Sequence, residues 1–186
     1  MAGIPNVTYT PRPLALAGIA VCGVLACALL GGTTNVVNGW VSPEYFVTIL
    51  RWDPNSDVWR AAIAQGIFEG LMFGIFFSLV FTVATGLITR GSCSFGFAFK
   101  HLLGILVGAY LCWTFGGLVA VGLATLSPQF YRQTFIGVPQ DFNAMLRYAW
   151  VGGSIWGAEF GGVFSIVVGV VVLRANWQRG VEKGKV

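Results

Sequence analysis

The sequence contains very few charged residues. Asp, Glu, Lys and Arg make up 10% of its 186 residues, whereas soluble globular domains carry about a quarter. Hydrophobic residues make up 56% of the chain and the mean hydropathy is +0.76. Such a composition excludes a soluble globular domain, and it also excludes a disordered chain, which needs low hydrophobicity and high charge. It indicates an integral membrane protein.

Metal-binding and catalytic patterns are also missing. The chain has one histidine, His101, and four cysteines without a Cys-x-x-Cys pair, so we expect no zinc or haem site, no cofactor and no disulfide framework. No nucleophile with a base, phosphate-binding loop or zinc-peptidase helix occurs, and we predict that the protein is not an enzyme. The net charge of +4 lies at predicted helix ends, which favours contact with lipid headgroups and not with nucleic acid.

Four apolar windows are long enough to cross a bilayer, which takes about 20 residues in a helix. The sequence therefore predicts an all-α membrane protein with a single integral membrane domain over residues 1–186. The predicted spans are 13–32, 61–88, 102–126 and 148–173.

The basic residues predict the orientation, because Lys and Arg next to spans are retained in the cytoplasm. Seven lie on the side of the termini and four on the other side. We therefore expect a multi-pass protein of the cell inner (plasma) membrane with both termini cytoplasmic and a basic tail over residues 175–186. An alternative is a cleaved export signal, because Arg12 precedes an apolar stretch that ends in a lipoprotein-like box at Cys27.

A repeated pattern predicts that the chain is a duplicated helical hairpin. Six residues recur 85 positions later without a gap: Gly23, Cys27, Gly31, Gly32, Ser42 and Pro43 match Gly108, Cys112, Gly116, Gly117, Ser127 and Pro128. Repeat one covers about 13–90 and repeat two about 98–174. Two such hairpins in tandem have the same orientation, so we expect a pseudo-two-fold axis along the membrane normal. The second and fourth spans should pack about this axis.

Glycines recur every four residues in the second and fourth spans. Because small residues allow helices to approach closely in lipid, we interpret these glycines as helix-packing residues: Gly66, Gly70 and Gly74, and Gly153, Gly157 and Gly161.

The first and third helices should stop before the Ser-Pro pairs, Ser42-Pro43 and Ser127-Pro128, because proline cannot continue a helix. Before the first pair, Thr34, Asn35 and Asn38 share a helix face that is apolar in repeat two. Two interpretations are open. The face lines a wet vestibule, or, as we favour, the helix emerges from the bilayer there.

Glu69 and Glu159 are the candidate intramembrane carboxyls. Ionisable groups at membrane depth are costly and usually face the bundle interior or a cavity. One hypothesis is a pair that handles protons or cations. The alternative is structural: a protonated Glu that donates to a backbone carbonyl, or a Glu near the interface that pairs with Arg60 or Arg147.

The segment Val41-Ser42-Pro43-Glu44-Tyr45-Phe46, which leads to Gln65-Gly66-Ile67-Phe68-Glu69-Gly70, resembles one in small multi-pass bacterial membrane proteins. The resemblance implies a bacterial inner membrane and carries no activity. From the sequence we expect a structural or accessory membrane component, as a homo-oligomer or in a larger membrane complex. The alternative is a small channel or transporter for protons or cations that uses Glu69 and Glu159.

Overall fold

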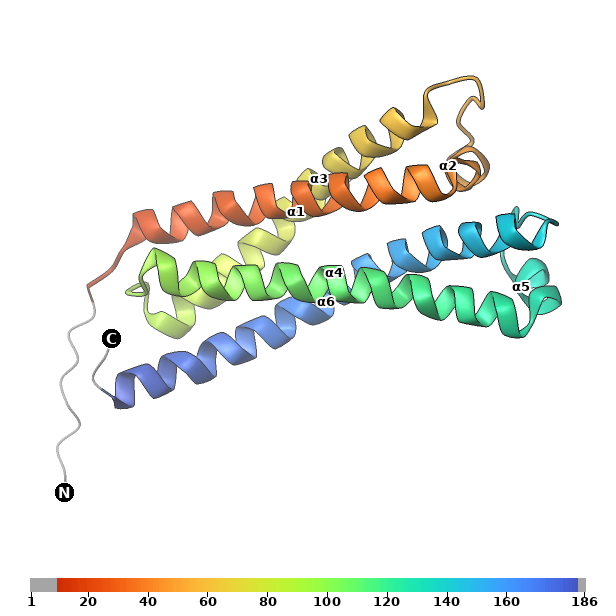
Figure 1. Ribbon diagram of the computed structural model, residues 1–186. Helices are drawn as coiled ribbons and strands as arrows, with labels where there is room; N and C mark the ends of the chain where they lie inside the picture. The colour runs from red at the N-terminus through yellow and green to blue at the C-terminus, as the bar shows by residue number, and fades with distance from the viewer. Residues whose placement is uncertain (1–9, 184–186) are drawn as a thin grey trace.

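The computed structural model describes residues 10–183, which form six α-helices and no strand within that range. Figure 1 shows four long helices and two short ones. The long helices are α1 (Pro13–Val41), α3 (Val58–Thr89), α4 (Phe95–Leu126) and α6 (Phe142–Glu182), and the short ones are α2 (Pro43–Leu50) and α5 (Pro128–Thr134). The all-helical architecture predicted from the sequence is confirmed.

Each long helix is long and apolar enough to cross a membrane, in agreement with the four predicted spans. The helices extend beyond the predicted windows. The first continues to Val41 instead of ending near residue 32, and the last runs from Phe142 to Glu182. Hydropathy detects only the segment that matches the bilayer thickness, whereas a helix ends where a cap or a proline stops it.

The Ser-Pro pairs end two of the long helices, as predicted. Pro43 and Pro128 occupy the first helical position of α2 and α5, where a missing N–H has no cost. Consequently α1 stops at Val41 and α4 at Leu126. The chain turns at these points into the two short helices.

Side-chain caps begin three of the long helices, α3, α4 and α6. The Asp57 carboxylate accepts a hydrogen bond from the Arg60 amide at 3.1 Å, and the Asp141 carboxylate accepts one from the Ala144 amide at 2.8 Å. Ser94 caps α4 in the same way. Such caps satisfy amides that have no partner within the helix.

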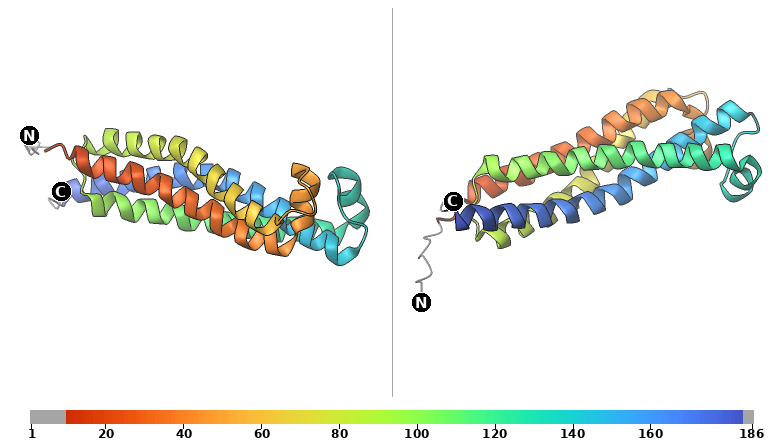
Figure 2. Two further views of the ribbon diagram at one scale, coloured as in Figure 1. Left: turned by 90° about the horizontal axis from the view of Figure 1, so that it is seen from above. Right: turned by 60° about the horizontal axis from the view of Figure 1, so that its bottom comes forward.

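The long helices form two hairpins, α1 with α3 and α4 with α6, and between the hairpins α1 contacts α4 and α3 contacts α6. Within each hairpin the two helices cross as they run along the bundle (Figure 1). The start of α1 and the end of α6 lie at one end of an elongated bundle, and α2 and α5 lie at the other (Figure 2). This is the arrangement expected for four consecutive spans.

Glycines lie where α1 and α3, which form hairpin one, cross each other. A Cβ added to Gly31 of α1 would fall on the carbonyl oxygen of Gly66 of α3, and one added to Gly70 would fall on that of Cys27. A Cβ on Gly74 would lie 2.9 Å from the Cys27 Cβ. The two backbones are therefore in direct contact, which only glycine permits.

The helices α4 and α6, which form hairpin two, cross in the same way. A Cβ on Gly116 of α4 would strike the Gly153 carbonyl oxygen, and one on Gly157 would strike that of Cys112. A Cβ on Gly161 would collide with the Cys112 side chain. Each predicted glycine series thus lies against the partner helix of its own hairpin.

Buried side chains gather towards the two ends of the bundle. One cluster joins all four long helices near the termini and contains Ile19, Phe81, Cys93, Ala98, Leu102, Ile105, Leu173 and Trp177. Two clusters near α2 and α5 are built around Phe46 and around Tyr131 with Met145. Most of the other large apolar side chains on the spans are exposed, as is suitable for a surface that faces lipid.

The structure contradicts one of the two interpretations of the polar stripe of α1. Thr34, Asn35 and Asn38 are buried between helices, so they do not line a wet vestibule; the other interpretation, that α1 emerges from the bilayer there, stays a prediction. The Asn35 amide donates to the Ala62 carbonyl at 3.0 Å, and the Ser154 hydroxyl of α6 donates to the Asn38 side chain at 3.0 Å. Buried polar groups in a bundle need such partners. Asn35 and Asn38 thus connect α1 to α3 and to α6, whereas the Thr34 hydroxyl donates to carbonyls of its own helix.

Most of the predicted basic tail is helical. Residues 175–182 continue α6, and Trp177 is 4% exposed within the cluster near the termini. This part of the tail is therefore packed against the bundle. Residues 184–186 of the predicted tail lie outside the described residues.

Candidate functional site

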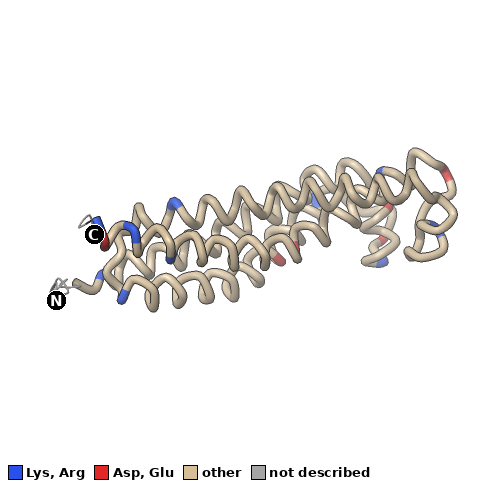
Figure 3. Tube along the Cα trace, turned by 90° about the horizontal axis from the view of Figure 1, so that it is seen from below, with Lys and Arg blue, Asp and Glu red and all other residues tan. Residues whose placement is uncertain are grey.

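The two candidate carboxyls lie well inside the spans. Glu69 is nine residues from Arg60, which is about 14 Å along a helix. Glu159 is 12 residues from Arg147 and 15 from Arg174, or about 18 Å and 22 Å. Figure 3 shows acidic positions near mid-length of the bundle, whereas most basic positions lie nearer its two ends. Each carboxyl therefore lies more than two helical turns from the nearest arginine of its own helix.

The structure brings the two carboxyls together. α3, which carries Glu69, contacts α6, which carries Glu159. The two side chains are close enough to interact electrostatically. Residues that are 90 positions apart in the sequence thus form a pair across the seam between the hairpins, which we call the α3–α6 seam.

The hydrogen bonds of the pair exclude one structural alternative. The Gln65 amide donates to the Glu69 carboxylate at 2.8 Å. Within residues 10–183, neither carboxyl has a Lys or Arg partner, and Arg60 pairs with Asp57 at 3.2 Å. Pairing with Arg60 or Arg147, which was one prediction from the sequence, is therefore not present.

Both glutamates are exposed in the single chain. An exposed carboxyl pair has two chemical capabilities. Each carboxyl can take up a proton or offer oxygen ligands to a cation, because two carboxylates that interact repel each other unless one is neutralised. It can also accept hydrogen bonds from a group that covers it. The cysteines are free and are not part of this pair.

A group of tyrosines lies between the carboxyl pair and the end of the bundle that carries α2 and α5. The rings of Tyr45 and Tyr148 have centroids 5.0 Å apart, and the Tyr148 hydroxyl donates to the Ile136 carbonyl at 2.7 Å. Burial raises the pKa of Tyr45, and the negative charge of Glu159 raises it further. Burial, with a smaller contribution from Tyr45, raises the pKa of Tyr131 to about 12. These phenols are therefore neutral at physiological pH.

The Ser-Pro residues predicted as a repeat motif are not part of this site. The Ser42 amide donates to the Asn38 carbonyl and the Ser127 amide donates to the Leu123 carbonyl, each at 3.0 Å. They close the ends of α1 and α4. Their role in the structure is to turn the chain.

Sequence reasoning missed two residues of the site. Gln65 lies four positions before Glu69, a spacing that places both on one helix face and could have identified it. Tyr45 comes close to Glu159 only through tertiary packing of α2 against α6, and no local pattern indicates this.

No cluster of three or more His, Cys, Asp or Glu side chains within residues 10–183 could hold a metal ion. Any cation at this site would therefore be held by the two carboxyls and neutral oxygens. Comparison with known proteins gives no match, whether with family models, curated proteins or solved structures.

Proposed function

We propose that the protein is a structural or accessory membrane component whose α3–α6 seam is covered by a second copy of the chain or by another membrane subunit. The observation that carries this proposal is the exposure of Glu69 and Glu159 as a pair at mid-length of the bundle. A carboxyl facing hydrocarbon costs several kcal/mol. A covering helix that donates hydrogen bonds removes that cost.

The surroundings of the pair support a covering helix. Four bulky apolar side chains next to the glutamates are more than half exposed: Met72, Phe73, Trp156 and Phe160. A partner helix on the seam would meet a polar centre with an apolar rim. Such a rim excludes lipid and water from buried polar contacts.

Disulfide cross-linking in native membranes tests the proposal. The probe is Phe73→Cys in a variant that lacks the four native cysteines, and the control is Leu111→Cys on α4, which is 65% exposed beside Cys112. We expect oxidation to link Phe73→Cys, but not Leu111→Cys, to a second copy or to one stoichiometric partner. No link at either position, with a monomeric mass in lipid, would contradict the proposal.

A second candidate function is favoured by the same pair. Two interacting carboxyls, with Gln65 bonded to one of them, form a centre that can take up a proton or a monovalent cation. A small channel or transporter would use it as the ion-binding step. Flux in liposomes should then fall at least tenfold for Glu69→Gln and Glu159→Gln and stay unchanged for Glu44→Gln on α2. Equal flux in all variants would reject this function.

We further infer that the two hairpins are duplicates related by an axis along the membrane normal. The equivalent contacts support this: a Cβ on Gly23 would lie 2.7 Å from the Ser78 hydroxyl, and one on Gly108 would lie 2.7 Å from that of Ser165. We propose a bacterial inner membrane, with the end of the bundle that carries the start of α1 and the end of α6 in the cytoplasm. A reporter fused after residue 183 should be active in the cytoplasm, and one inserted at Gly137 should be active outside.

A further inference from the structure

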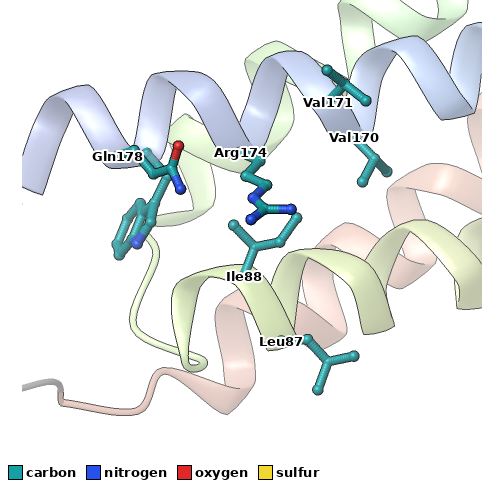
Figure 4. Close-up of a pocket in the computed structure, with 7 residues that line it drawn as sticks. Leu87, Ile88, Val170, Val171, Arg174 and Gln178 are labelled. Carbon is teal, nitrogen blue, oxygen red and sulfur yellow. The ribbon is translucent and has the colours of Figure 1, made fainter.

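A groove lies between α3 and α6 near the end of the bundle where α6 finishes. Its walls are Leu87 and Ile88 of α3 and Val170 and Val171 of α6 (Figure 4). Its volume is about 460 Å³, within the range of about 300–1,000 Å³ for small-molecule sites. Apart from Arg174 and Gln178, its lining residues are apolar and therefore suit a hydrocarbon chain.

One positively charged side chain, that of Arg174, lines this groove. The Arg174 side chain reaches from α6 towards Ile88 of α3 (Figure 4). It is exposed, and within residues 10–183 it makes no hydrogen bond or ion pair. Gln178, one turn further along α6, also lines the groove and adds an amide donor. The polar side chains of Arg174 and Gln178 thus lie at one end of the groove, and the aliphatic side chains line the rest.

We propose that this groove binds one anionic phospholipid, with the phosphate on Arg174 and an acyl chain along Leu87, Ile88 and Val170. Charge complementarity identifies the headgroup as anionic, because a guanidinium binds phosphate through two parallel hydrogen bonds. The apolar walls identify the occupant as a lipid, because a soluble anion would leave them uncovered. Other basic residues lie near the helix ends at the same end of the bundle: Arg12 before α1, Arg90 after α3, Lys100 near the start of α4 and Arg179 in the last turn of α6.

The bound chain would point along the α3–α6 seam towards the carboxyl pair. Leu87 follows Glu69 by 18 residues, five full helical turns, and Val170 follows Glu159 by 11, about three turns. Groove and carboxyls therefore share a face on both helices. The inference does not depend on the proposed function, because Glu69 and Glu159 take no part in holding the headgroup.

Native mass spectrometry of the full chain in detergent tests the proposal, with phosphatidylglycerol and phosphatidylcholine of identical acyl chains as probes. We expect one tightly bound phosphatidylglycerol and at least fivefold weaker phosphatidylcholine. Arg174→Gln should lose about fivefold in phosphatidylglycerol affinity, whereas Arg147→Gln, at the opposite end of α6, should lose none. Equal binding of both lipids, or equal effects of both substitutions, would overturn the proposal.

A second variant separates a lipid from a free anion. Val170→Trp fills the groove and leaves Arg174 in place, so it should weaken phosphatidylglycerol binding as much as Arg174→Gln does. Unchanged binding in Val170→Trp, or full competition by inorganic phosphate, would show a simple anion site and overturn the proposal. Circular dichroism and thermal unfolding of each variant verify that the fold is intact.

Discussion

Hairpin one and hairpin two use the same crossing but different polar groups. Both pack glycine against backbone, at Gly31 with Gly66 and at Gly116 with Gly153. In contrast, the buried Asn38 of hairpin one corresponds to an apolar leucine in hairpin two, 85 positions later. The two membrane glutamates are also at non-equivalent positions. The comparison teaches that close backbone packing requires glycine in both hairpins, whereas a polar side chain of hairpin one, Asn38, makes the hydrogen bond that connects it to hairpin two.

The largest loss of stability is expected when a bulky side chain replaces a glycine at either helix crossing. Gly70→Leu and Gly157→Leu should each lower the free energy of unfolding by about 3 kcal/mol or more, because each side chain would strike backbone and overpacking alone costs about 1–3 kcal/mol. The control is Gly122→Leu, since a Cβ there has no neighbour within 4 Å. Thermal unfolding in detergent measures the loss. A strong effect in only one hairpin would break the equivalence of the crossings.

The helix caps should show a smaller and equal effect. Asp57→Ala and Asp141→Ala remove the same type of cap from α3 and α6, and each should cost about 1 kcal/mol. Asp57→Asn and Asp141→Asn keep a capping oxygen and are the matched controls. If denaturant titration finds the Asn variants as unstable as the Ala variants, charge and not capping is the source of the stability.

The polar connection between the hairpins should contribute less. A double-mutant cycle of Asn38→Ala with Ser154→Ala should give a coupling energy of about 0.6 kcal/mol, the average for hydrogen bonds between membrane helices. The cycle of Asn35→Ala with Ser154→Ala should give none, because Asn35 bonds to Ala62 within hairpin one. Equal coupling in both cycles would mean that the stripe acts through packing and not through a specific bond.

The smallest effect at neutral pH concerns Tyr131, which occupies in hairpin two the position of the buried Phe46 in hairpin one. Its pKa is raised to about 12 from an ordinary value of 10.0. The folded state therefore favours the neutral phenol, and this contribution to stability is complete below pH 10 and lost between pH 10 and 12. Unfolding curves should fall less steeply in this range for Tyr131→Phe. Parallel curves for parent and variant would contradict the assignment.

The sequence alone determined the membrane class, the four spans and the helix ends at the Ser-Pro pairs, because apolar length and proline act locally. It also identified the glutamates and the glycines as unusual residues. The tertiary structure decided which elements meet. It buried Asn35 and Asn38 between helices, brought Glu69 within electrostatic reach of Glu159, and positioned Arg174 at an apolar groove. These pairings depend on how two hairpins rotate and cross, and side-chain contacts between distant segments set that rotation.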